Sequence, residues 1–149
     1  MTQLFPIRSM GDTARAMSHE NVRVIRNLFD AFNEAGIKPT LPRFFTRDAV
    51  FEEPPEQPAP RVARGREAVG EMFGAFDEAW AEHRSIPEEI RALDDDRVLA
   101  FSVDHLRGRD GIEFEQPSST IFTLRDGKVA RMQSFWDRER ALEAAGLSE

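Results

Sequence analysis

The fold is decided by residues 97–136, which read RVLAFSVDHLRGRDGIEFEQPSSTIFTLRDGKVARMQSFW. Alternating apolar residues predict strands over 97–107 and 112–125, separated by a turn that contains glycine. Asp126-Gly127 is a strong signal for a two-residue hairpin, so a further strand is expected over 128–136. Long strands joined by short turns predict an antiparallel meander, and a sheet of this kind twists and curls.

Helices are expected upstream of this meander. Apolar residues at helical spacing predict one helix from an N-cap at Ser18 to a stop at Gly36, and a second from Gly65 to about Trp80. Gly70 and Gly74 lack the spacing of a phosphate-binding loop and are expected to allow close packing of this second helix against the sheet.

Shorter elements complete the pattern. A short apolar piece around 41–45 precedes a strand over 48–53, which must end at the prolines that follow because proline cannot donate to a sheet ladder. A strand over 86–93 leads through an acidic turn into the meander, and a short helix over 138–145 closes the chain. This order predicts an α+β fold, with helices on one face of a curved sheet that forms a cone with an open mouth.

Length and composition favour one globular domain. The chain has 149 residues, which is enough to bury a core. We expect a flexible arm over 1–17 and the folded domain over 18–149. No apolar run has the length of a membrane span or the form of a signal peptide, so the default expectation is a cytoplasmic protein with no membrane partner.

Two compositional features exclude classes of function. The chain contains no cysteine, which removes disulfides and thiolate chemistry. Its net charge of −7 argues against a nucleic-acid partner, which requires a basic face. The three histidines are scattered and do not have the spacing of a metal site.

Four segments resemble the SnoaL-like proteins of the nuclear-transport-factor-two-like superfamily: residues 44–54, 65–69, 125–129 and 135–147. They read FFTRDAVFEEP, GREAV, RDGKV and FWDRERALEAAGL. The resemblance implies a cone-shaped domain with a pocket for an apolar small molecule, without a cofactor, and with frequent homodimers formed through the outer sheet face. It says less about function, because the superfamily includes ketosteroid isomerases, polyketide cyclases, dehydratases, epoxide hydrolases and binding proteins.

The resemblance also suggests a catalytic acid. Ketosteroid isomerases carry an acid-acid-proline step whose second acid moves protons, and here that residue is Glu53. We expect the apolar surroundings to raise its pKa towards neutrality. The two oxyanion donors of that mechanism do not carry over: its tyrosine would fall near Leu28 and its aspartic acid near Thr120, and the chain contains no tyrosine.

The resemblance places further residues at the pocket. His105 is the second catalytic candidate, and Asp137 is a minor one whose main expected role is to cap the last helix. His83 is expected in an exposed loop. The expected substrate-binding residues are Leu28, Phe32, Met72, Phe76, Phe101, Val103, Ser118, Thr120, Phe122, Met132, Ser134 and Trp136.

The residues that alternate with these are expected on the outer face of the sheet. Val98, Ala100, Ser102, Asp104 and Leu106 form that set, and their apolar character predicts a homodimer interface. Three functions remain open: a cofactor-independent isomerase, cyclase or lyase acting on a polyketide, terpenoid or steroid-like molecule; a non-catalytic binding protein; and an epoxide or ester hydrolase.

Overall fold

The computed structural model describes the backbone of residues 4–147 and the side chains of residues 13–147. The chain folds as an α+β domain, as expected. In chain order its elements are α1 (Leu4–Ala35), α2 (Ile37–Phe44), β1 (Phe45–Glu52), β2 (Val62–Arg64), α3 (Arg66–Glu78), β3 (Glu82–Ala92), β4 (Arg97–Arg107), β5 (Glu113–Arg125), β6 (Lys128–Phe135) and α4 (Arg138–Ala144).

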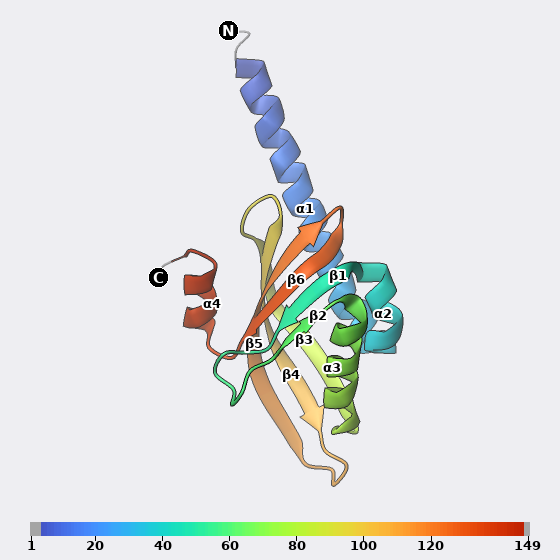
Figure 1. The fold of residues 1–149 in the computed structure, drawn as a ribbon. Helices are drawn as coiled ribbons and strands as arrows, with labels where there is room; N and C mark the ends of the chain where they lie inside the picture. Colours follow the sequence, from blue (N-terminus) through green and yellow to red (C-terminus); the bar gives the residue numbers. More distant parts are fainter. Residues whose placement is uncertain (1–3, 148–149) are drawn as a thin grey trace.

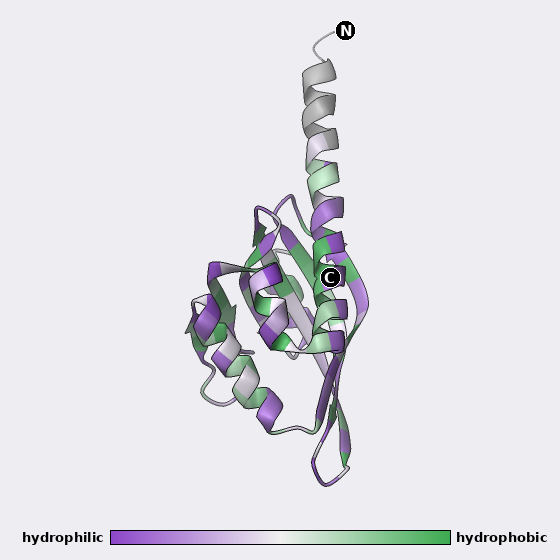
Figure 2. Ribbon diagram, turned by 90° about the vertical axis from the view of Figure 1, so that its right-hand side faces the viewer, coloured by the Kyte–Doolittle hydropathy of each residue, from purple (hydrophilic) through white to green (hydrophobic). Residues whose placement is uncertain are grey.

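The strands form one curved, unclosed mixed sheet in the order β2-β1-β6-β5-β4-β3. β1 runs parallel to β6, and the other neighbours are antiparallel. In Figure 1 the lower half of α1, with α2 and α3, lies on one side of the sheet, and α4 lies on the other. Beside the sheet, α1 carries apolar residues alternating with hydrophilic ones (Figure 2). Among the described residues, no helix is long and apolar enough to span a membrane.

The sheet has an apolar core on each face. The inner core joins residues of α1, α2 and α3 to inward-facing residues of the strands, among them Ala100 and Phe122. The outer core is smaller and lies under α4, where Leu142 packs with Phe101 and Ile121. Both faces of the middle strands are therefore apolar. One face packs against α1, α2 and α3, and the other packs against α4.

This arrangement corrects the expected orientation of β4. Ser102 pairs with Ser118, and residues paired across two antiparallel strands share a face. Since Ser118 faces the helices, so do the residues expected to be outside: Val98, Ala100, Ser102, Asp104 and Leu106. The apolar strip that predicted a homodimer thus lies inside the domain, where Val98 and Ala100 are fully buried. The sequence could not show this, because apolar residues occupy both alternating sets.

The first helix is longer than expected. Helix α1 begins at Leu4, so Ser18 is inside it rather than at its N-cap. The hydroxyl of Ser18 donates to the carbonyl of Asp94, 3.1 Å away in the turn before β4. The predicted flexible arm is therefore helical from residue 4, and residues 1–3 lie outside the described part of the chain.

Strand β3 also differs from the expectation. It begins at Glu82, so His83 belongs to a strand and not to a loop. The register against β4 shifts between Pro87 and Glu89, which marks a bulge with one extra residue. Between the start of β3 and the bulge, the residues that face inward are therefore those that would face outward in a strand without the bulge.

Candidate functional site

A cavity of about 540 Å³ lies between α1, α3 and the inner face of the sheet. That volume is within the range of about 300–1,000 Å³ found for small-molecule sites. Most of its wall is apolar and comes from the helices and the strands beside them. The apolar residues of the wall include Leu28, Phe29, Phe32, Phe51, Met72, Phe73, Phe76, Trp80, Phe122 and Met132.

One side of the cavity is polar. Ser102 of β4 lies opposite Ser118 of β5, and Thr120 of β5 lies opposite Ser134 of β6. All four line the cavity. The Thr120 and Ser134 hydroxyl oxygens are 3.3 Å apart and buried. Because they share one face of three adjacent strands, these four residues form a polar row beside the apolar wall.

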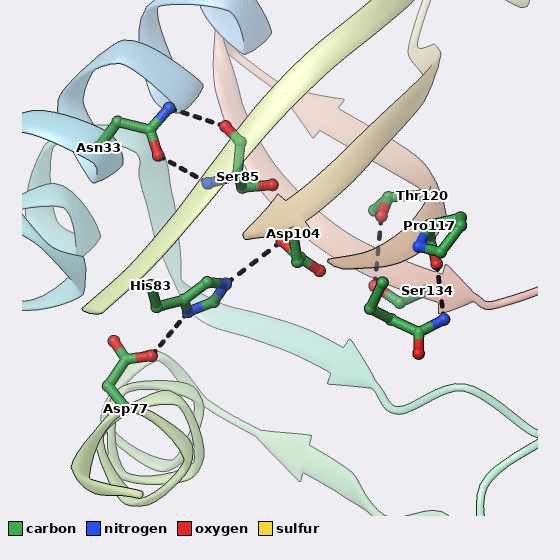
Figure 3. A network of polar contacts seen from close by, with 9 residues as sticks. Asn33, Asp77, His83, Ser85, Asp104, Pro117, Thr120 and Ser134 are labelled. Carbon is green, nitrogen blue, oxygen red and sulfur yellow. Dashed lines mark hydrogen bonds and ion pairs between the residues drawn. The ribbon is translucent and has the colours of Figure 1, made fainter. Parts of the chain in front are cut away.

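A histidine between two carboxylates lies at one end of this row (Figure 3). The Nδ1 atom of His83 is 2.8 Å from Oδ1 of Asp77, near the end of α3. Its Nε2 atom is 3.2 Å from Oδ1 of Asp104, on β4. The His83 side chain is only 10% exposed. His83 and Asp104 both line the cavity, so this buried charge cluster is accessible to a bound molecule.

The two carboxylates determine the charge of the imidazole. Burial lowers the pKa of His83, but the hydrogen bonds and negative charges of Asp104 and Asp77 outweigh it and raise that pKa to about 9. At neutral pH the ring is therefore an imidazolium that donates from both nitrogens. The cluster carries one positive and two negative charges.

Aromatic rings fix the position of the imidazole. Phe32 of α1 and Phe76 of α3 meet the His83 ring edge to face, with centroid separations of 5.1 and 5.3 Å. Contacts of this kind favour a defined ring orientation. The two helices therefore fix the orientation of the imidazole, and the two carboxylates stabilise its protonated form.

Asp104 has a free acceptor atom. Its Oδ1 atom receives the hydrogen bond from His83, whereas none of the hydrogen bonds among the described residues reaches its Oδ2 atom. The Asp104 side chain is 24% exposed, and it borders the cavity. An ionised carboxylate in this position can accept a proton from a bound molecule through Oδ2.

Glu53 borders the same cavity but is fully engaged. The Arg61 guanidinium donates to both of its carboxylate oxygens at 3.1 Å, and the backbone N–H of Arg61 donates to Oε1 at 2.8 Å. Burial raises the pKa of Glu53, but these Arg61 hydrogen bonds prevail and leave that pKa below its ordinary value. The expected shift towards neutrality is therefore wrong, because the sequence did not reveal the arginine eight residues away.

The segment between β1 and β2 is tied to the residues that follow β6, the strand next to β1. The Oε2 atom of Glu56 accepts hydrogen bonds from the backbone N–H groups of Trp136 and Asp137, at 3.1 and 2.8 Å. Trp136 lines the cavity together with Pro54 and Gln57 of this segment. Glu56 thus fixes the segment over one border of the cavity.

The structure brings most of the expected lining residues together. Ten of them border the cavity: Leu28, Phe32, Met72, Phe76, Ser118, Thr120, Phe122, Met132, Ser134 and Trp136. Phe101 and Val103 do not, because they lie on the opposite face of β4. Asp137 caps α4 as expected, its Oδ1 accepting from the N–H of Glu139 at 3.0 Å.

His105 also lies outside the cavity, contrary to the expectation from the sequence. It pairs with Glu115 on the outer face, where its Nδ1 atom is 3.3 Å from Oε2 of that residue and its side chain is 46% exposed. The imidazole in the cavity is His83 instead. The alternation of His83 and Ser85 hinted at an inward-facing pair, but without the bulge the register would place Ser85 opposite His105 rather than Asp104.

Solved structures share this curved sheet and its covering helices. Bal32a, from a soil-derived mobile gene cassette, is 22% identical with a TM-score of 0.70, and the match covers 79% of this chain and 89% of that one. A protein described as a SnoaL-like polyketide cyclase, from Jannaschia sp. CCS1, is 18% identical with a TM-score of 0.67, covering 80% and 86%. TerC, co-crystallised with polyporic acid, is 20% identical with a TM-score of 0.68, covering 85% and 98%.

The curved sheet with its covering helices therefore has the nuclear-transport-factor-two-like fold. Residues 25–132 match the SnoaL-like domain family, and the chain belongs to that family. No match was found among proteins with curated functions.

Proposed function

We propose that the protein is a cofactor-independent enzyme that moves a proton on an apolar, oxygenated small molecule. In this proposal Asp104 accepts and returns the proton through Oδ2, and the His83 imidazolium holds the other oxygen, Oδ1. The supporting observation is the free Oδ2 atom of Asp104, which borders the cavity while Oδ1 is held by a buried cation.

The proton comes from a carbon beside a carbonyl group. Oδ2 of Asp104 takes the proton, and the C–H electron pair moves onto the carbonyl oxygen to give an enolate. Hydroxyl groups of Ser102 and Ser118 are suited to donate hydrogen bonds to that oxygen. Return of the proton to a different atom completes an isomerisation. Attack of the enolate carbon on a second carbonyl would close a ring, with the proton on Asp104 returned to the alkoxide oxygen that forms there.

The lining of the cavity favours a particular shape of substrate. A rigid apolar body fits the aromatic wall, and oxygens along one edge fit the row of hydroxyls. Polyketides, terpenoids and steroid-like molecules have this character. The similar structures described as a SnoaL-like polyketide cyclase and as a complex with polyporic acid are consistent with that class.

Deuterium exchange into 2-tetralone tests the proposal without knowledge of the natural substrate. This bicyclic ketone is apolar, and its acidic protons lie beside a carbonyl. We expect the protein to accelerate exchange in D₂O, measured by proton NMR, and Asp104→Asn to slow it by at least about 100-fold. Asp48→Asn is the matched control, because Asp48 lies on the exposed part of β1.

Either of two results would contradict the proposal. The first is exchange in Asp104→Asn at the rate of the unmodified protein. The second is 2-tetralone bound in the cavity, detected by NMR shifts of the lining residues, with no acceleration of exchange. That second result would instead support a binding protein without chemistry.

A further inference from the structure

A contact between α1 and β3 lies beside the charge cluster of His83, Asp77 and Asp104. The proposed proton transfer does not itself use this contact. Asn33, near the C-terminal end of α1, forms two hydrogen bonds with the backbone of Ser85 on β3 (Figure 3). Its Nδ2 atom donates to the Ser85 carbonyl at 2.7 Å, and its Oδ1 atom accepts from the Ser85 N–H at 2.8 Å. The reciprocal pairing also fixes which end of the amide is oxygen.

The site of this contact is the free edge of the sheet. β3 is the last strand in the sheet order, so one of its edges has no neighbouring strand. The N–H and C=O groups on such an edge lack ladder partners. The Asn33 side chain supplies both partners at Ser85, as another strand would, in a part-buried environment where lost hydrogen bonds are costly.

The same residue pair lies next to the proposed proton-transfer site. Ser85 is opposite Asp104 in the β3–β4 ladder, and His83 is two residues before Ser85 on the same face. The neighbour of Asn33 is Phe32, whose ring meets the His83 ring. Two consecutive residues of α1 thus contact the 83–85 segment, one through the backbone and one through the imidazole.

We propose that Asn33 is a positioning residue of this site: by fixing Ser85 to α1, it holds His83 at hydrogen-bond distance from Asp104. This inference rests on the proposed function for its catalytic meaning. Its physical content is independent, because β3 is bulged just beyond Ser85 and has no strand on its other edge to hold it. Without Asn33, the 83–85 segment keeps its ladder with β4 but loses its backbone attachment to α1.

A second asparagine of α1 provides a matched control. Asn21 is nearly buried, and its Nδ2 atom donates to the carbonyl of Asp95 at 3.0 Å, in the turn that joins β3 and β4. It therefore links the same helix to the same hairpin at the end away from His83. A general effect on stability would follow from either substitution, whereas an effect on His83 should follow only from loss of Asn33.

The test is an NMR titration of the His83 ring in Asn33→Leu, which keeps the side-chain size but removes both hydrogen bonds. We expect the pKa of His83 to fall by about one unit or more, a tenfold loss of proton affinity, because its bond to Asp104 is disturbed. In Asn21→Leu that pKa should stay at the value of the unmodified protein. An unchanged His83 pKa in folded Asn33→Leu would overturn the inference.

Two further measurements complete the test. If Asn33→Leu does not fold, Asn33→Ala is titrated in the same way, and the exchange of the Ser85 amide is measured in the unmodified protein. Protection of that amide is expected, and exchange at the rate of an unbonded edge amide would overturn the inference. Binding of 2-tetralone in the cavity of the unmodified protein without accelerated exchange would refute the proposed function alone, because the His83 titration does not depend on it.

Discussion

His83 and Asp104 lie diagonally across the β3–β4 ladder, and Nε2 of the imidazole is 3.2 Å from Oδ1 of the carboxylate. The pair exists because the bulge in β3 brings Ser85 opposite Asp104 and turns His83 towards the cavity. Asp77 on α3 contacts the other ring nitrogen, so three elements meet at one buried imidazole.

The first prediction concerns stability and pH. The pKa of His83 in the folded protein, about 9, is above its ordinary value of 6.5. A raised pKa stabilises the folded state fully below about pH 6.5, and this contribution is lost as the pH rises through about 9. His83→Gln should therefore cost about 3 kcal/mol near pH 6, with the deficit shrinking as the pH rises from about 6.5 to about 9. Denaturant unfolding at several pH values measures both proteins.

The matching control is His105→Gln, which removes an exposed imidazole from the outer face. Its difference from the unmodified protein should be small across the same pH range. A deficit for His83→Gln that stays constant from pH 6 to about pH 10 would mean that the imidazole is not charged in the folded protein.

The second prediction separates two glycines of α3. A Cβ atom at Gly70 would lie 2.6 Å from Cδ1 of buried Leu41, whereas a Cβ at Gly74 would meet nothing within 4 Å. Alanine in a helix is favoured over glycine by about 0.8–1 kcal/mol. Gly74→Ala should therefore stabilise the protein by roughly that amount, and Gly70→Ala should be less stable than Gly74→Ala by about 1 kcal/mol or more.

Thermal unfolding of the two variants checks this order. The expectation that both glycines permit close packing against the sheet is wrong, because Gly70 lies close to Leu41 of α2 and Gly74 faces open space. Equal stabilities for the two variants would show that Leu41 moves aside without cost.

The limits of sequence-based prediction follow from particular residues. Asp126-Gly127 and the alternation around it specified the β5–β6 hairpin, and Ser118, Thr120 and Ser134 were assigned to the correct face. β4 was assigned to the wrong face because α4 covers Leu99 and Phe101, which makes both of its alternating sets apolar. Only the pairing of β4 with β5 shows which of the two alternating sets faces the cavity. That pairing belongs to the tertiary structure, and the local sequence pattern does not encode it.

The charge cluster could not be predicted from the sequence, for a related reason. Its residues are separated in sequence, and the register that joins His83 to Asp104 depends on one extra residue in β3. No feature of the local sequence pattern predicts that bulge. At Glu53 the motif located a carboxylate at the cavity, but its partner Arg61 follows a proline-rich segment whose path could not be predicted.

The third prediction compares the two carboxylates of the cavity. Both oxygens of Glu53 accept hydrogen bonds from Arg61, and these bonds hold its pKa below the ordinary value despite burial. A weak base with no free oxygen is poorly suited to proton abstraction. Glu53→Gln should therefore slow 2-tetralone exchange less than tenfold, against about 100-fold or more for Asp104→Asn. The reverse order would assign the base to Glu53.

The fourth prediction concerns the segment between β1 and β2. Glu56 accepts from two backbone N–H groups of residues 136 and 137, and hydrogen bonds to a charged acceptor contribute about 1.5–3 kcal/mol each. Both bonds are exposed to solvent, so Glu56→Ala should destabilise the protein by less than their sum, about 1–3 kcal/mol, and increase protease cleavage within residues 54–60. Glu56→Gln should lose less, because its amide oxygen still accepts.

Limited proteolysis followed by mass spectrometry locates the cleavage. Glu88→Ala, on the bulge of the edge strand β3, is a suitable control because none of the hydrogen bonds among the described residues involves its side chain. Cleavage within residues 54–60 at the same rate in Glu56→Ala and Glu88→Ala would show that Glu56 does not anchor the segment.

The proposed chemistry requires that His83 be a cation held by Asp104, and an NMR titration of its ring measures this directly. The chain has three histidines, so each signal can be assigned by substitution. We predict a pKa of about 9 for His83 and a clear decrease in Asp104→Asn, because one of the two neighbouring charges is removed. A His83 pKa near 6.5 that does not respond to Asp104→Asn would contradict the account.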